Sequence, residues 1–113
     1  MAYNEYLAER ITQTLKEKKV LFDTRKMMGG LCFMVDDKMC IGINKDFLMA
    51  RIDPLYYEIY LKEKGSRPMD FTGRPMKGFI FVEPEGTDLE TDLEEWIDRC
   101  LEFNPKAKSS KKK

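Results

Sequence analysis

Three apolar segments joined by two very short polar pairs dominate the middle of the chain. Segments 31–35, 38–44 and 47–52 are rich in aliphatic, aromatic and methionine residues, and only an Asp-Asp pair at 36–37 and a Lys-Asp pair at 45–46 separate them. Two-residue connections between such segments are typical of antiparallel β-hairpins. The centre of the chain is therefore predicted to be a meander of antiparallel strands, which the flanking segments must cover with helices.

The short turns also predict a register for these strands. Phe33 is expected to lie opposite Cys40, and Ile43 opposite Leu48. Successive side chains then alternate between two faces, and both faces are largely apolar. One face is predicted to carry Cys32, Met34, Met39, Ile41, Ile43, Leu48, Ala50 and Ile52, and the other Leu31, Phe33, Val35, Cys40, Phe47, Met49 and Arg51.

Three further segments predict helices. Residues 3–18 carry leucine and isoleucine at every fourth position, with Asn4 as a possible cap. Asp53-Pro54 is a strong start for a second helix over 55–64, which Gly65 ends. The third helix follows a capping-box pattern at residues 87–90, and its apolar stripe consists of Leu89, Leu93, Trp96, Ile97, Cys100 and Leu101.

Together the segments predict an α+β domain. With a strand near residue 20 and another over 78–83, we expect a two-layer α/β sandwich with a mainly antiparallel sheet of five to six strands. The expected element order is α-β-β-β-α-β-β-α. One domain is predicted over residues 1–104, followed by a disordered lysine-rich tail over 105–113.

The composition excludes several kinds of chemistry. The chain contains no histidine, the commonest general acid–base residue and metal ligand. Cys32, Cys40 and Cys100 are widely spaced, unlike zinc ligands or a disulfide framework, and they indicate buried thiols in a reducing compartment. No phosphate-binding or dinucleotide-binding glycine motif is present. We therefore expect no catalytic residues, no metal and no cofactor.

Charge and hydropathy set the expected surroundings. The chain has 20 basic and 20 acidic residues, but five lysines lie within residues 106–113, and the remainder carries a net charge of −5. An acidic body is untypical of a dedicated nucleic-acid binder, so only a weak, non-specific contact by the lysine tail is expected. A solubilising terminus is the alternative for that tail. No signal peptide or membrane span is evident, which favours a cytoplasmic location.

The loop over 67–77 is the most distinctive candidate for binding. It gathers arginines, a lysine, an aspartate and a threonine around a glycine, and it could offer its cations to a carboxylate or phosphate. The alternative is a rigid connector stiffened by two prolines. Paired glycines at 29–30 either form an anion-binding nest or allow a tight strand turn. The candidate binding residues are Arg51, Arg67, Asp70, Thr72, Gly73, Arg74, Lys77, Gly29 and Gly30.

The two-faced apolar sheet predicts an interface. Three short helices can cover one face of a five- or six-stranded sheet, so the other face should expose Phe33, Val35, Phe47 and Met49, or their opposites. We expect a homodimer or another protein partner on that face. The alternative is a second layer of helices.

Several motifs resemble the TfoX N-terminal domain family. Residues 25–35, R-K-M-M-G-G-L-C-F-M-V, are similar to its K-M-F-G-G-L-x-F-M segment, and residues 2–11 fit its first helix. Residues 48–51, L-M-A-R, resemble its L-M-x-R strand. Residues 67–79, R-P-M-D-F-T-G-R-P-M-K-G-F, resemble its P-M-x-F-x-G-R-P-M-K-G hallmark. Met28 departs from the family's usual phenylalanine but keeps its bulk.

The resemblance carries expectations for fold and function. It implies a two-layer α/β fold like that of the secretion chaperones. Longer bacterial members regulate natural competence and the transcription of DNA-uptake genes, and they carry a helical C-terminal domain that this chain is expected to lack. The resemblance thus implies a stand-alone, non-enzymatic regulatory or protein-interaction module. The alternative is a small-ligand or anion-binding domain that uses residues 67–78.

Overall fold

Six antiparallel strands form one open sheet in the order β1-β2-β3-β4-β6-β5. The computed structural model describes residues 3–27, 30–68 and 78–107. The strands are β1 (Asp23–Met27), β2 (Gly30–Val35), β3 (Lys38–Asn44), β4 (Phe47–Arg51), β5 (Ser66–Pro68) and β6 (Phe79–Val82), and the helices are α1 (Glu5–Glu17), α2 (Tyr57–Tyr60) and α3 (Glu90–Phe103). The predicted α+β class is confirmed, with four strands instead of three before α2.

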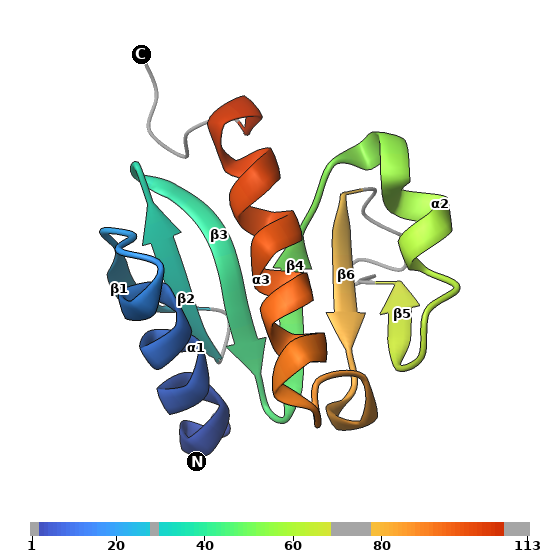
Figure 1. The fold of residues 1–113 in the computed structure, drawn as a ribbon, viewed down its shortest axis with the longest axis horizontal. Helices are drawn as coiled ribbons and strands as arrows, with labels where there is room; N and C mark the ends of the chain where they lie inside the picture. Colours follow the sequence, from blue (N-terminus) through green and yellow to red (C-terminus); the bar gives the residue numbers. More distant parts are fainter. Residues whose placement is uncertain (1–2, 28–29, 69–77, 108–113) are drawn as a thin grey trace.

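The two long helices cover one face of this sheet. Figure 1 shows α1 and α3 side by side on that face, with α2 beyond β6 at the side of the molecule. Their buried residues recur at helical spacing: Leu7, Ile11 and Leu15 in α1, and Leu93, Trp96, Ile97 and Cys100 in α3. The sheet meets them with Leu31, Phe33, Val35, Cys40, Ile41, Ile43, Leu48, Ala50, Ile52, Ile80 and Val82.

The predicted short turns are confirmed. Val35 pairs with Lys38, and Asn44 pairs with Phe47, so each hairpin has a two-residue loop. Asp36 and Asp37 have φ angles of 56° and 63°. Two successive positive φ values are typical of a type I′ turn, which matches the natural twist of the strands.

The predicted register between β2 and β3 is wrong beyond the first turn. The ladder shifts next to Phe33, which pairs with Ile41 and not with Cys40. Cys40 is therefore the extra residue of a β-bulge, and it joins Ile41 in the core under the helices. Because a one-residue shift exchanges the faces of a strand, Cys32 does not share a face with Ile41 as predicted. The predicted pairing of Ile43 with Leu48 is confirmed.

The helix ends follow the predicted signals in part. The Asn4 side chain accepts a hydrogen bond from the Leu7 N–H at 3.1 Å and caps α1, as predicted. The second helix is shorter than predicted, with a 3₁₀ turn over Pro54–Tyr56 followed by the single α-turn of α2. Aromatic and β-branched residues dominate this segment, and they favour helices weakly.

The predicted capping box at the start of α3 is wrong. Leu89 occupies the N-cap position and makes no side-chain cap. The preceding residues form a 3₁₀ turn over Pro84–Gly86, and the Thr87 N–H closes it by donating to the Pro84 carbonyl at 3.0 Å. The Thr87 hydroxyl donates to the same carbonyl at 3.4 Å, and Thr87 lies before the N-cap position that Leu89 occupies.

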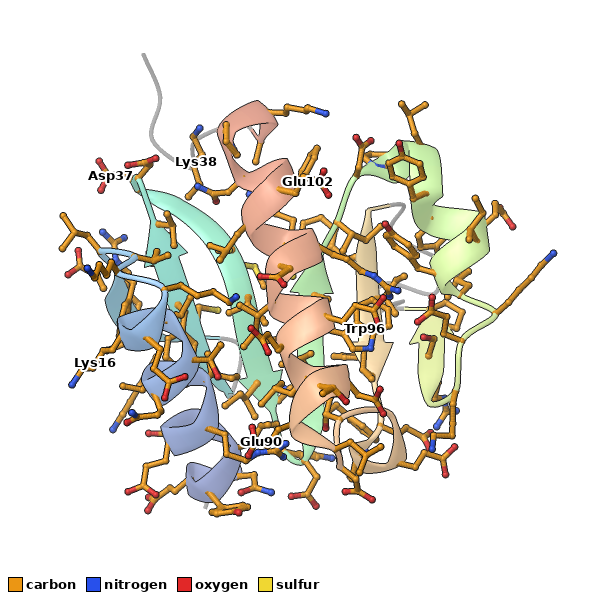
Figure 2. The ribbon with its side chains drawn as sticks, in the orientation of Figure 1. Lys16, Asp37, Lys38, Glu90, Trp96 and Glu102 are labelled. Carbon is orange, nitrogen blue, oxygen red and sulfur yellow. The ribbon has the colours of Figure 1, made fainter. Side chains whose placement is uncertain are left out.

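A cation clamps α2 against α3. Arg99 donates two hydrogen bonds to the Glu63 carboxylate, at 2.9 and 2.8 Å. Its guanidinium lies 4.1 Å from the centre of the Tyr60 ring and 4.7 Å from that of Trp96. Figure 2 shows Trp96 on the side of α3 that faces α2 and β6. A bidentate arginine stacked on two rings holds the short helix in place.

The end of α3 is anchored to the first hairpin. Asn104 is buried, and its amide donates to the Val35 carbonyl at 3.1 Å, while the Lys38 ammonium donates to the Asn104 carbonyl at 3.2 Å. Beyond α3 a 3₁₀ turn spans Asn104–Lys106, and Ala107 is buried. The rest of the lysine tail lies outside the described residues. No described helix combines the length and apolarity that a bilayer crossing requires.

Candidate binding surface on the helix-free face of the sheet

The face of the sheet opposite to α1 and α3, here named the far face, carries a second apolar cluster. Its buried centre consists of Cys32, Met34 and Met49. Met39, Phe79 and Phe81 pack against this centre and are half-buried. Figure 1 places none of the described helices over the far face. The cluster is thus rich in methionine and phenylalanine, with a buried centre and a half-buried border, and no helix among the described residues covers it.

The prediction of which residues the uncovered face exposes is wrong. Phe33 and Val35 face the helices and are buried, because the bulge at Cys40 reverses the predicted grouping. Met49 does lie on the far face, but it is 0% exposed, and Phe47 is half-buried. The strongly exposed large apolar residues lie away from the sheet ladder: Tyr6, Leu21, Leu55, Tyr56, Ile59 and Leu89.

Arg51 stands at one end of the far face. It lies on β4 opposite Phe79, and its guanidinium is 5.4 Å from the centre of that ring. It donates a hydrogen bond to the Met39 carbonyl at 3.3 Å. Burial lowers the pKa of Arg51, and the nearby Cys40 thiol opposes this effect. Since a guanidinium keeps its proton in proteins, Arg51 places a fixed positive charge beside the apolar cluster.

Arg67 provides a second cation on the same face. It lies on β5 opposite Phe81, which in turn pairs with Met49. Its guanidinium forms an ion pair with the Glu83 carboxylate at 2.6 Å, and its side chain remains 61% exposed. An exposed pair of this kind contributes little to stability, so Arg67 can exchange Glu83 for another carboxylate at small cost.

The two ends of the candidate loop meet next to Arg51. Pro68, the last residue of β5, pairs with Ile80 on β6. At the other end of the loop, the Gly78 carbonyl accepts a hydrogen bond from the Ile52 N–H at 2.8 Å. The fold therefore brings Arg51, Arg67 and both loop ends to one region. The other candidates of the loop, Asp70, Thr72, Gly73, Arg74 and Lys77, lie outside the described residues, as does Gly29.

Gly30 does not belong to this region. It pairs with Asn44 on β3, at the end of the sheet away from Arg51. A Cβ atom on Gly30 would overlap the carbonyl oxygen of Ile43. The missing side chain therefore permits the close approach of two backbones, which supports the strand-turn interpretation of the glycine pair.

A second glycine shapes the far face and was not among the predicted site residues. Gly42 lies between Cys32 and Met49 in the ladder, and a Cβ atom there would come within 2.7 Å of the Met49 Cε methyl. The Met49 side chain thus lies across Gly42 and fills the centre of the cluster. The signal in the sequence was a glycine inside an otherwise apolar strand.

The thiols are expected to be unreactive in the folded chain. Burial raises the pKa of Cys40 to about 12 and raises the pKa values of Cys32 and Cys100 above the ordinary value of 9.0. A disulfide reagent at about pH 8 attacks thiolates only, so it should modify none of the three before unfolding and all three afterwards. Because the folded chain holds these protons more tightly, its stability should fall as the pH rises above about 9. Modification of a thiol in the native chain would contradict this expectation.

Another hollow lies on the opposite side of the sheet, where α1 and α3 pack. It is a groove of about 560 Å³ between α1 and α3, and its lining is mostly acidic: Glu9, Arg10, Gln13, Thr14, Glu17, Glu90 and Glu94. Arg10 donates to the Thr87 carbonyl at 2.7 Å and pairs with Glu90 at 3.4 Å. Lys18 bridges Glu94 and Asp98 at 3.0 and 2.9 Å. These contacts join the two helices.

Comparison with known proteins identifies one relationship. A family model described as the TfoX N-terminal domain matches residues 19–104 of the 113-residue chain. The match includes all six strands, α2 and α3. No curated protein sequence and no solved structure matches the chain significantly.

Proposed function

The chain belongs to the TfoX N-terminal domain family, and from this premise we propose that it is a non-enzymatic interaction module with a regulatory role. Its far face binds a segment of a protein partner that carries a bulky apolar side chain beside a carboxylate. The regulated process that the family resemblance implies, transcription of competence genes in the bacterial cytoplasm, is part of this proposal.

The observation that supports the proposal is an adaptable apolar cluster with cations at its border. The cluster combines methionines with Phe79 and Phe81, and flexible thioethers adjust to differently shaped side chains. Arg51 and Arg67 lie opposite these two rings in the ladder. Arginine binds carboxylates through paired hydrogen bonds, so the border selects an acidic segment while the half-buried Met39, Phe79 and Phe81 contact its apolar residue.

The chemistry of the thiols supports a role in binding and not in catalysis. A cysteine nucleophile needs a lowered pKa, whereas burial raises the pKa of all three thiols here. The chain contains no histidine to activate them. The cations that Arg51 and Arg67 supply on the far face are guanidinium groups, which stay protonated near neutral pH and so cannot act as general acids or bases.

Selection from a library of random peptides displayed on phage tests the proposal. The folded chain should enrich peptides in which aspartate or glutamate lies next to a leucine, methionine or aromatic residue. Arg67→Glu should weaken binding of the best peptide at least tenfold, about 1.4 kcal/mol, because it replaces attraction by repulsion at an exposed position. Lys62→Glu, which changes the same charge on the exposed turn after α2, is the matched control and should leave affinity unchanged.

Two results would contradict the proposal. Enrichment of basic peptides would exclude an acidic partner, and equal binding by the wild type and Arg67→Glu would exclude the far face. A third result would favour the anion-binding alternative. In that case inorganic phosphate would raise the melting temperature of the chain, and Arg67→Glu would remove the effect.

A further inference from the structure

Strand β1 presents an open edge of the sheet. Among the strands of the described residues it pairs with β2 alone, and the sheet order places it at one end. Residues 23–26 are all exposed. An unpaired edge offers backbone N–H and C=O groups to another strand, so its side chains decide which strand can dock there.

The sequence of β1 is complementary to itself in one register. When two copies pair their β1 edges antiparallel, a two-fold axis normal to the sheet relates them. Both copies then turn the same face to the same side, so a residue can lie opposite only a residue of its own face. Asp23 and Arg25 both lie on the far face, opposite Met34 and Cys32. When Thr24 is opposite Thr24 of a second copy, each Asp23 is opposite the other copy's Arg25.

The neighbouring registers are disfavoured by charge. A shift that centres the pair on Arg25 places two guanidinium groups opposite each other, and a shift that centres it on Asp23 does the same with two carboxylates. Like charges directly opposite in a ladder repel, whereas opposite charges and threonine pairs attract. The alternating pattern D-T-R of residues 23–25 thus favours a single alignment.

From this complementarity we infer that a second copy of the chain docks on β1 and extends the sheet across a two-fold axis at Thr24. The chain carries no formal net charge, so long-range repulsion does not oppose the pairing. A pair of five-residue strands is a small interface, and the dimer is expected to be reversible.

A hollow at the same edge fits the second copy's Arg25. It has a volume of about 370 Å³. Its apolar walls are Leu21, Phe22 and Met34, and its three carboxylates are those of Asp23, Asp36 and Asp37. In the proposed register, the incoming guanidinium approaches from the side of Asp23. An arginine places its aliphatic stem on apolar walls and its charge among carboxylates.

Pairing of two β1 edges has a structural consequence for the far face. The pairing itself does not depend on the partner segment proposed to bind that face. Because the axis is normal to the sheet, both copies turn their far faces to the same side. The two apolar clusters then lie on one continuous sheet of twelve strands, twice the six of a single chain.

Charge-reversal variants with complementary partners test this inference. Analytical ultracentrifugation of the full chain, from about 10 µM to about 1 mM, should show a monomer–dimer equilibrium for the wild type. Asp23→Arg and Arg25→Asp should each weaken dimerisation at least about tenfold, because each places like charges opposite each other twice. An equimolar mixture of the two variants should associate again, since each copy then supplies the charge that the other lacks.

Controls separate a lost interface from a lost fold. Both substitutions are at exposed positions, so thermal unfolding followed by circular dichroism should match the wild type. The double variant D23R/R25D should dimerise like the wild type, and Glu58→Arg, on α2, should have no effect. A wild type that stays monomeric, single variants that dimerise normally, or a folded mixture that stays monomeric would each overturn the inference.

Discussion

Replacing Phe33 with alanine is expected to lower the free energy of unfolding by about 3–5 kcal/mol. The Phe33 ring is 0% exposed between the sheet and its helices, and its centre lies 5.7 Å from that of the Phe22 ring. Truncation removes both the burial of the ring and its contacts, and the neighbouring strands cannot close the cavity. Chemical denaturation followed by circular dichroism measures the change.

Phe81→Ala is the matched control, since it makes the same truncation on the other face. Phe81 is half-buried on the far face, so its loss should cost less stability, about 1–2 kcal/mol. The same variant should weaken binding of the selected acidic peptide, whereas Phe33→Ala should not while it remains folded. A larger loss of stability for Phe81→Ala would mean that the faces of β2 and β6 are assigned the wrong way round.

Replacing Gly30 with alanine is expected to cost about 3 kcal/mol, close to the upper range for overpacking. The new Cβ atom would overlap the Ile43 carbonyl oxygen, and this neighbour belongs to a strand backbone that cannot rotate away. Either the β2–β3 ladder separates locally or the hairpin shifts. The melting temperature should fall accordingly, with no added salt or anion able to restore it.

Gly42→Ala offers a comparison at a second strand glycine. There the nearest atom is the Met49 Cε methyl at 2.7 Å, the far end of a flexible side chain. Met49 can move, so the cost in stability should be smaller, about 1 kcal/mol, and Met49→Ala should relieve it. If Gly30→Ala proved as mild as Gly42→Ala, Gly30 would not be required by backbone packing, and its role as an anion nest would regain support.

Local signals in the sequence were sufficient for the three central strands and the two turns between them, but not for β5, which lies at the start of a segment that reads as a loop. Asp36-Asp37 marks the first hairpin because aspartate tolerates positive φ, Lys45-Asp46 marks the second as a polar pair between apolar segments, and the apolar runs mark the strands. The register of β2 on β3 could not be derived in the same way. Cys40 looks like any small core residue in the sequence, and only the packing of two strands against two helices decides that it forms a bulge.

The sequence predicted individual residues of the candidate site, but it did not predict which of them the sheet order brings together. Arg67 was recognised from its dense polar loop, and Arg51 from the L-M-A-R strand. Their placement on one face follows from the insertion of β6 between β4 and β5, which the linear order of elements does not specify. The same holds for β1, because a strand is recognisable as an edge only after all neighbours are placed.

The clamp around Arg99 gives the chain an internal optical probe. Trp96 is the only tryptophan, and its indole lies against a guanidinium and 5.9 Å from the centre of the Tyr60 ring on the other helix. Tryptophan emission from the unlabelled protein therefore originates at the junction of α2 and α3. Its intensity and wavelength would register a release of the short helix even when the sheet stays intact.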